Sequence, residues 1–244
     1  MKDNDKEINN SIEVNTDKNL KNKNNKKFKI KKDKLKQTKK KKGIHVGIGS
    51  FMLILFCTFL MVVATFLQLN ISHFYLPSKF FNGEILTLND FIFSIKYIPQ
   101  VPVVLFIGGL LGHKLGFFTV LLYIILGLFF VPVFALGGGF SYIFEYSFGY
   151  ILAFLPAVFV LGKILKKDYS YVNIAKAVFF SVLIIHVIGI IYMCVLALIK
   201  QAGINFIISW ISAQSGIKIL YDFVLGYLLV LCTKYARIIL WFYL

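Results

Sequence analysis

Long apolar runs recur between residue 47 and the C-terminus, and they constrain this chain more than any other feature. Runs of about 17 to 25 mostly apolar residues match the length that an α-helix needs to cross roughly 30 Å of hydrocarbon. Because hydrophobic residues fill 58% of the 244 positions, too little polar surface remains to cover a water-soluble globule. The runs do not alternate in polarity, as the strands of a membrane β-barrel do. The sequence therefore predicts an all-α, polytopic membrane protein.

Proline, glycine and charged residues divide the apolar sequence into about six predicted transmembrane helices. Their approximate ranges are 47–69, 98–111, 117–131, 148–165, 177–198 and 216 to the C-terminus. The stretch 70–97 is predicted to be a polar and aromatic connection, with a short interfacial amphipathic helix around residues 91–93. A tight turn is predicted at 112–116, and a semi-polar connection at 200–215.

The N-terminal segment 1–45 differs in composition from the rest of the chain and carries most of the formal net charge of +16. It is rich in Lys and Asn and poor in apolar residues, so we predict a disordered tail ahead of a transmembrane domain at 46–244. Its position beside a membrane span favours a cytoplasmic anchor near anionic lipid over a nucleic-acid-binding arm. The remaining Lys and Arg residues then place both termini in the cytoplasm of a multi-pass protein of the cell membrane.

Motifs of catalysis and metal binding are missing from the sequence. The three cysteines and four histidines are scattered, which predicts neither a disulfide framework nor a metal site. Nucleotide-binding and hydrolase motifs are absent as well. We therefore expect no enzymatic activity and no cofactor, and any ATP hydrolysis that drives transport must come from another chain.

The stretch 123–150 contains a break in the apolar sequence, where Pro132 is followed by three consecutive glycines, Gly137, Gly138 and Gly139. Backbone groups freed by such a break are tolerated near hydrocarbon only where protein buries them or where they line a cavity. The break therefore predicts either one wall of a binding pocket or an ordinary flexible turn, since Pro and Gly also build turns. The residues alone favour neither.

Asp222 is the acid that stands out within an apolar span, and such residues are functional candidates by default. It either contacts a ligand or pairs with Lys218, one helical turn earlier. Ser147 suits a helix N-cap where the chain re-enters the membrane. Tyr146 and Tyr150 serve either as interfacial residues or as pocket walls. His186 is predicted to form a hydrogen bond to a neighbouring helix.

Several of these segments together resemble the BioY family. The resemblance rests on the Gly-rich segment 109–116, on 122–127, on Val131–Pro132–Val133–Phe134–Ala135 with the glycines at 137–139, on 149–154, and on an acid at position 222. Members of the family are biotin-binding, substrate-specific subunits (S components) of energy-coupling-factor transporters. The resemblance implies a bundle of about six helices in the lipid bilayer, with a transmembrane coupling subunit and two ATPases as partners.

The same resemblance implies roles for individual residues. Asp222 and Ser147 would bind the ureido ring of biotin. The family often has a Lys three residues after the acid, where this chain has Leu225, and we hypothesise that Lys218 supplies the cation for the biotin carboxylate instead. Phe134, Tyr146, Tyr150 and the loop at 137–139 would cover the ring system and chain. Two alternatives remain open: an S component for another vitamin or heterocycle, and a membrane scaffold protein that uses the basic tail.

Overall fold

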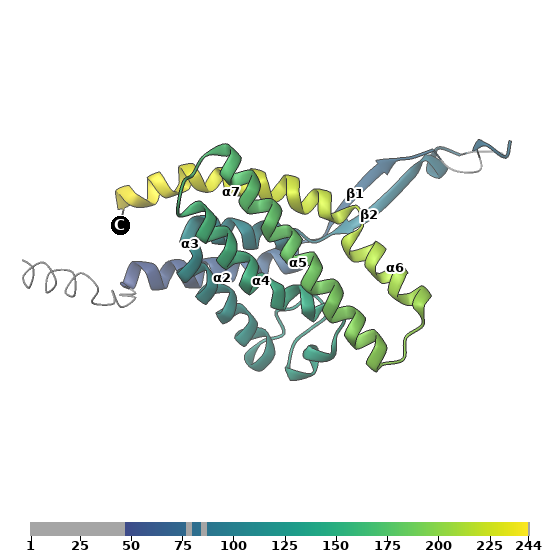
Figure 1. The fold of residues 1–244 in the computed structure, drawn as a ribbon, viewed down its shortest axis with the longest axis horizontal. Coiled ribbons are helices and arrows are strands. Elements are labelled where there is room, and N and C mark those ends of the chain that lie inside the picture. Colours follow the sequence, from purple (N-terminus) through teal and green to yellow (C-terminus); the bar gives the residue numbers. More distant parts are fainter. Residues whose placement is uncertain (1–46, 77–79, 84–86, 244) are drawn as a thin grey trace, which may run out of the picture. The chain divides into compact units, whose positions relative to one another are not determined.

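The computed structural model describes residues 47–76, 80–83 and 87–243. Figure 1 shows a helical bundle with one β-hairpin inserted after the first described helix. The elements are α2 (Ile48–Phe66), β1 (Leu69–Phe74), β2 (Ile92–Tyr97), α3 (Gln100–Ile125), α4 (Phe148–Leu165), α5 (Tyr171–Ile199), α6 (Ile204–Ser215) and α7 (Lys218–Tyr243). Short 3₁₀ or π-helical turns lie at Leu88–Phe91, Leu126–Phe130 and Phe140–Phe144. The predicted tail at 1–45 lies outside the described residues.

Within the described residues, five helical segments are long and apolar enough to cross a membrane. They are Ile48–Phe66, Gln100–Phe130, Phe148–Leu165, Tyr171–Ile199 and Ile204–Ile239. The predicted class, a helical polytopic membrane protein, is confirmed. The count of six spans stays a prediction, because the apolar segment Gln100–Phe130 covers both the second and the third predicted spans.

Helix α3 is in fact a helical hairpin, because the chain reverses at Gly112, whose φ of 74° and ψ of −178° are non-helical. The Gln100 Nε2 atom lies 2.8 Å from the Tyr123 hydroxyl. In a continuous helix these residues would be about 35 Å apart, at 1.5 Å rise per residue. The reversal packs on α4 at Gly162, where a Cβ atom would lie 2.3 Å from the His113 backbone nitrogen. The predicted turn at 112–116 agrees with this geometry.

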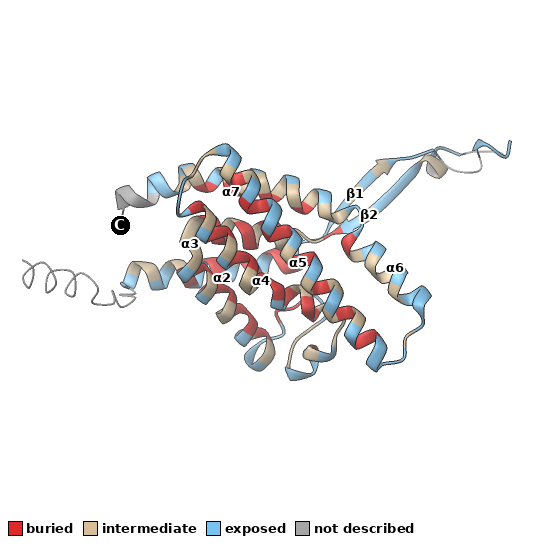
Figure 2. Cartoon of the chain, viewed as in Figure 1, coloured by how far each residue is buried: buried red, intermediate tan, exposed pale blue. Residues whose placement is uncertain are grey.

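The core lies among α3, α4 and α5, whose buried faces meet in Figure 2. It is apolar and includes Leu105, Ile107, Val158, Leu161 and Ile174, which are fully buried. The outward faces are also apolar, as a bundle solvated by lipid requires. Large exposed side chains, such as those of Phe59 and Phe179, cover them.

Two predicted connections have regular structure instead. Residues 92–97 form β2, paired antiparallel with β1 in a register that places Ser72 opposite Ser94, so the predicted interfacial helix at 91–93 is wrong. Alternating side chains along both segments permit this pairing. The predicted connection at 200–215 contains α6, which starts after Gly203 and ends at Gly216. Because glycine at both ends is typical of loops, the sequence alone does not reveal this 12-residue helix.

Candidate functional site

Asp222 lies in the second turn of α7 and is 4% exposed, so its carboxylate is removed from both water and lipid. Tyr97, the last residue of β2, donates its hydroxyl to Oδ1 at 2.7 Å. The His186 Nε2 atom on α5 lies 3.1 Å from Oδ2. A buried carboxylate is expensive unless it is paired or hydrogen-bonded. Here both of its oxygens are held, by two elements distant in sequence.

The histidine continues the polar chain away from the carboxylate. Its Nδ1 atom lies 2.9 Å from the Ser215 Oγ atom, and the Tyr150 hydroxyl lies 2.7 Å from the same Oγ. With a neutral imidazole that donates from Nε2, the Nδ1 atom accepts from Ser215, which in turn accepts from Tyr150. The predicted hydrogen bond of His186 to a neighbouring helix is present, and its partner is the candidate ligand-binding acid.

Tyr97 acts as a neutral donor at this site. Burial, followed by the charge of the Asp222 carboxylate and the hydrogen bond to it, holds the pKa of the Tyr97 hydroxyl well above its usual range. The hydroxyl therefore keeps its proton at physiological pH and donates to Oδ1. The base of the β-hairpin is tied to α7 by this bond, and also by a contact between His73 of β1 and Tyr221.

A cavity of about 370 Å³ opens beside this carboxylate. Its size falls within the usual range for small-molecule sites, about 300–1,000 Å³. The charged residues on its wall are Asp222, Lys96 and Lys218. Its uncharged polar residues are Gln68, Tyr97, Gln100, Tyr142, Ser147, Tyr150, His186 and Gln214, and its apolar ones are Ile98, Val101, Ala135, Leu136, Ile151 and Phe154. A wall that combines apolar side chains with fixed polar and charged groups suits a small amphipathic molecule.

Lys218 contacts the cavity but is not the hydrogen-bond partner of Asp222. Its ammonium donates to the Gln214 Oε1 atom at 3.3 Å, while the carboxylate is satisfied by Tyr97 and His186. The Asp222–Lys218 ion pair considered from the sequence is therefore not formed, and Lys218 instead has a long hydrogen bond to Gln214. A cation bound only to a neutral amide can reorient toward an anionic ligand.

Gln100 belongs to a second polar cluster that supports the cavity wall. Its Nε2 atom donates to Thr65 Oγ1 at 3.0 Å and to the Tyr123 hydroxyl at 2.8 Å, and those two oxygens are 2.9 Å apart. Thr65 and Tyr123 are almost fully buried. The cluster joins α2 to both arms of α3 and fixes the end of α3 that faces the cavity.

The structure brings four of the predicted site residues together on the cavity wall: Asp222, Ser147, Tyr150 and Lys218. The others do not line it. The fully buried Phe134 packs on Tyr142 with ring centroids 4.6 Å apart. Tyr146 packs on Phe206 of α6, with ring centroids 5.1 Å apart.

The three glycines shape the loop rather than contact the cavity. Gly137 and Gly139 adopt φ values of 117° and 91°, which favour glycine. Residues 134 and 137 exchange two backbone hydrogen bonds, of 2.9 and 3.0 Å, which close a tight turn. A Cβ atom on Gly138 would lie 2.6 Å from the Pro132 Cα atom. The turn presents Ala135 and Leu136 to the cavity, so the break does form part of a pocket wall.

Sequence reasoning missed Tyr97, Gln100, Lys96 and Gln214 as wall residues. Tyr97 and Lys96 lie in a segment predicted to be a connection, so nothing indicated that they faced α7. Gln100 lies in the first turn of a predicted span and Gln214 in a predicted connection, and polar residues are ordinary in both places. A usable signal was the pair of intramembrane polar residues His186 and Asp222, since such groups seek one another in hydrocarbon.

Fold and site together define a class: a helical membrane protein with a small-molecule cavity that ends at a buried carboxylate. The BioY family matches residues 36–239. The chain therefore belongs to the BioY family.

Two curated relatives agree with this family. A probable biotin transporter BioY of Lysinibacillus sphaericus is 32% identical over 108 residues, covering 41% of this chain and 53% of the relative. A probable biotin transporter BioY of Pyrococcus horikoshii is 45% identical over 73 residues, covering 28% of this chain and 45% of the relative. The chain thus spans about half the length of the curated relatives it matches.

A crystal structure of the S-component for biotin from an ECF-type ABC transporter has a similar fold. The TM-score is 0.57 with 21% sequence identity, and the match covers 80% of this chain and 94% of that chain. At this identity the likeness concerns the fold. The match shows that the helical-bundle fold is shared over most of this chain.

Proposed function

We propose that this chain is the biotin-capturing subunit of an energy-coupling-factor uptake transporter in the cell membrane. The observation that carries the proposal is the buried Asp222 carboxylate at the tip of a small cavity, held by Tyr97 and His186. The biotin-related names of the family's relatives and of the similar structure support the same ligand.

The carboxylate suits the ureido ring of biotin. A carboxylate offers about four lone-pair positions, and the hydrogen bonds from Tyr97 and His186 occupy two of them. Ureido N–H groups would take the remaining positions as charge-assisted hydrogen bonds. Ser147, on the same wall, would offer its hydroxyl to the ureido oxygen. The Tyr150 ring and the side chains of Leu136 and Phe154 would cover the apolar part of the ring system.

The opposite end of the ligand would meet positive charge. Lys96 and Lys218 both line the cavity, and the ammonium of Lys218 has only a long bond to an amide oxygen. Either cation would attract the carboxylate of the biotin chain. The arrangement would suit a ligand that is a hydrogen-bond donor at one end and an anion at the other.

Transport would need further chains. The similar structure is named as the S-component of an ECF-type ABC transporter, which supports a transmembrane coupling subunit and two ATPases as partners here. Those ATPases would supply the energy, and this chain would act without enzymatic activity or a cofactor of its own. Both termini would lie in the cytoplasm, in keeping with the charge bias of the loops.

The test is equilibrium binding of labelled biotin to the purified full chain, with unlabelled vitamins as competitors. We expect wild type to bind biotin in preference to the other vitamins, and Asp222→Ala to weaken binding at least about 30-fold, from the roughly 2–5 kcal/mol that a buried charged partner contributes. Asp168→Ala is the matched control, because that acid is exposed and lies between α4 and α5. Equal affinity of wild type and Asp222→Ala would contradict the proposal.

A further inference from the structure

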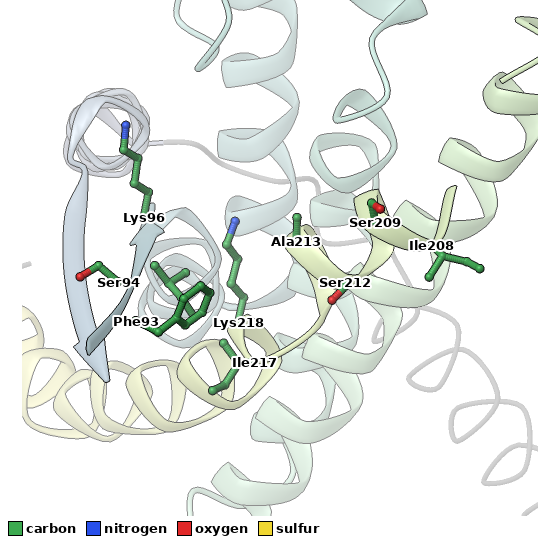
Figure 3. Close-up of a pocket in the computed structure, with 10 residues that line it drawn as sticks. Phe93, Ser94, Lys96, Ile208, Ser209, Ser212, Ala213, Ile217 and Lys218 are labelled. Atoms are coloured by element: carbon green, nitrogen blue, oxygen red, sulfur yellow. The ribbon is translucent and has the colours of Figure 1, made fainter. Parts of the chain in front are cut away.

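A second and larger hollow lies between β2 and α6, with a volume of about 760 Å³. We call it the outer groove. Ser94 and Lys96 of β2 line one side, and Ser209, Ser212 and Ala213 of α6 line the other. Figure 3 shows the Lys96 and Lys218 side chains extending in a similar direction from β2 and from the start of α7.

The outer groove and the cavity share two residues, Lys96 and Lys218. These two cations therefore border both spaces. The cavity ends at Asp222, which is 4% exposed, whereas Lys96 is exposed. A ligand whose ring binds Asp222 would direct its chain end toward these cations, and a group attached to that end would point toward the outer groove.

The walls of the outer groove are suited to an amide. The described sheet has two strands, so β2 has one edge without a strand partner among the described residues. Along an antiparallel edge, alternate residues point their N–H and C=O groups away from the sheet. An extended amide bonds to such an edge in the manner of an added strand. The hydroxyls of Ser209 and Ser212 provide further donors and acceptors on the opposite wall.

We propose that the outer groove accepts the tail of carboxyl-conjugated ligands, that is, amides of biotin with an amino acid or short peptide. This inference rests on the proposed function. N-biotinyl-lysine represents the class. Its ring binds at Asp222, its amide passes between Lys96 and Lys218, and its terminal carboxylate reaches the outer groove within range of the flexible Lys96 ammonium.

The charge at the chain end should decide the relative affinities of biotin and its amides. Free biotin and N-biotinyl-lysine both carry a carboxylate that these lysines can reach, so their affinities agree within about tenfold. The primary amide of biotin has neither this charge nor a tail. It binds about tenfold to a hundredfold more weakly than biotin, because a hydrogen bond to a charged group contributes more than one between neutral groups.

The experiment is competition for labelled biotin on the purified full chain, using biotin, its primary amide and N-biotinyl-lysine. Ala213→Trp fills the outer groove without altering a cavity residue. Ile204→Trp is the matched control, since Ile204 is 72% exposed on the same helix and does not line the outer groove. We expect Ala213→Trp to weaken N-biotinyl-lysine at least tenfold while biotin is unchanged, and Ile204→Trp to change neither.

Two different failures are separable. If biotin binds but N-biotinyl-lysine is more than a hundredfold weaker on wild type, the inference is overturned and the proposed function stands. The inference is likewise overturned, with the proposed function intact, if Ala213→Trp weakens both ligands equally. If wild type binds no biotin at all, the proposed function fails, and this inference fails with it.

Discussion

The two ends of the helical bundle are built differently: one is closely packed and the other encloses a cavity. At the Gly112 end, backbone packs directly on backbone: a Cβ atom on Gly162 would lie 2.3 Å from the His113 nitrogen. At the Asp222 end, polar side chains hold the helices around a cavity of about 370 Å³. Along α7 the two ends are separated by the run from Asp222 to Thr233, about 16 Å of helix.

This difference suggests that one end of the bundle mainly stabilises the fold and the other mainly binds the ligand. In lipid, helices associate through close van der Waals packing at small residues and through hydrogen bonds between helices. The Gly112 end uses mainly the first means, with Gly108 and Gly109 packed on side chains of α4 and α7, and adds the hydrogen bonds of Tyr169 to Gly109 and Thr233. The Asp222 end uses the second and leaves space open. Substitutions at the first end should change folding, and those at the second should change ligand affinity.

The largest expected effect is on stability, from Gly162→Ala. The added methyl group would overlap the His113 backbone nitrogen, and no rotamer relieves that overlap. We expect a loss of about 3 kcal/mol in the free energy of unfolding, the upper end of the usual cost of overpacking, which thermal unfolding in detergent would detect. The matched control is Gly203→Ser, because a Cβ atom there has nothing within 4 Å and serine suits its N-cap position. Equal melting temperatures of the two variants would refute the close-packing role.

His186→Ala should come next and should affect both properties. It leaves the Asp222 Oδ2 atom and the Ser215 hydroxyl without their imidazole partner. A buried group left unsatisfied costs about 1–3 kcal/mol, and a freed carboxylate no longer has a fixed orientation toward a ligand. We expect about tenfold weaker biotin binding together with a lower melting temperature. Unchanged biotin affinity would mean that His186 has no part in positioning the acid.

Tyr97→Phe should act mainly on binding. It removes the hydrogen bond to Asp222 Oδ1 but keeps a ring in the same place, so packing is largely preserved. A bond to a charged acceptor is worth about 1.5–3 kcal/mol, and we expect about tenfold weaker binding in an equilibrium assay. Tyr75→Phe is the control, because Tyr75 is 46% exposed. If both variants lost the same binding affinity, the Tyr97 hydroxyl would have no specific role in ligand binding.

The smallest effect is expected from Thr233→Val at the Gly112 end. The Thr233 hydroxyl lies 2.7 Å from the Tyr169 hydroxyl, which also donates to the Gly109 carbonyl at 2.7 Å. Thr233→Val removes this contact and the 2.6 Å bond from the Thr233 hydroxyl to the Val230 carbonyl, and we expect a cost of about 1 kcal/mol of unfolding free energy. Biotin affinity should stay the same, as measured by equilibrium binding. A change in biotin affinity without a change in stability would contradict the claim that the Gly112 end affects folding and not binding.

Local features of this molecule are predictable from the sequence, whereas its long-range contacts are not. Apolar runs indicate most of the helices, and an isolated acid in hydrocarbon singles out Asp222, because both signals lie in adjacent residues. Tyr97 lies 125 positions from Asp222 and His186 lies 36, so their convergence depends on the bundle. The strand at 92–97 escapes prediction because a two-stranded hairpin depends on its partner strand. In the sequence, the glycines at 137–139 fit either a pocket wall or a flexible turn, and only the packing shows that their turn presents Ala135 and Leu136 to the cavity.

The most direct test of the central claim is a structure of the full chain with biotin bound. We expect both ureido nitrogens at the Asp222 end, with at least one within about 2.7–3.2 Å of its carboxylate, and the biotin chain directed toward Lys96 and Lys218. Biotin bound elsewhere, or an Asp222 side chain turned toward lipid, would contradict the claim.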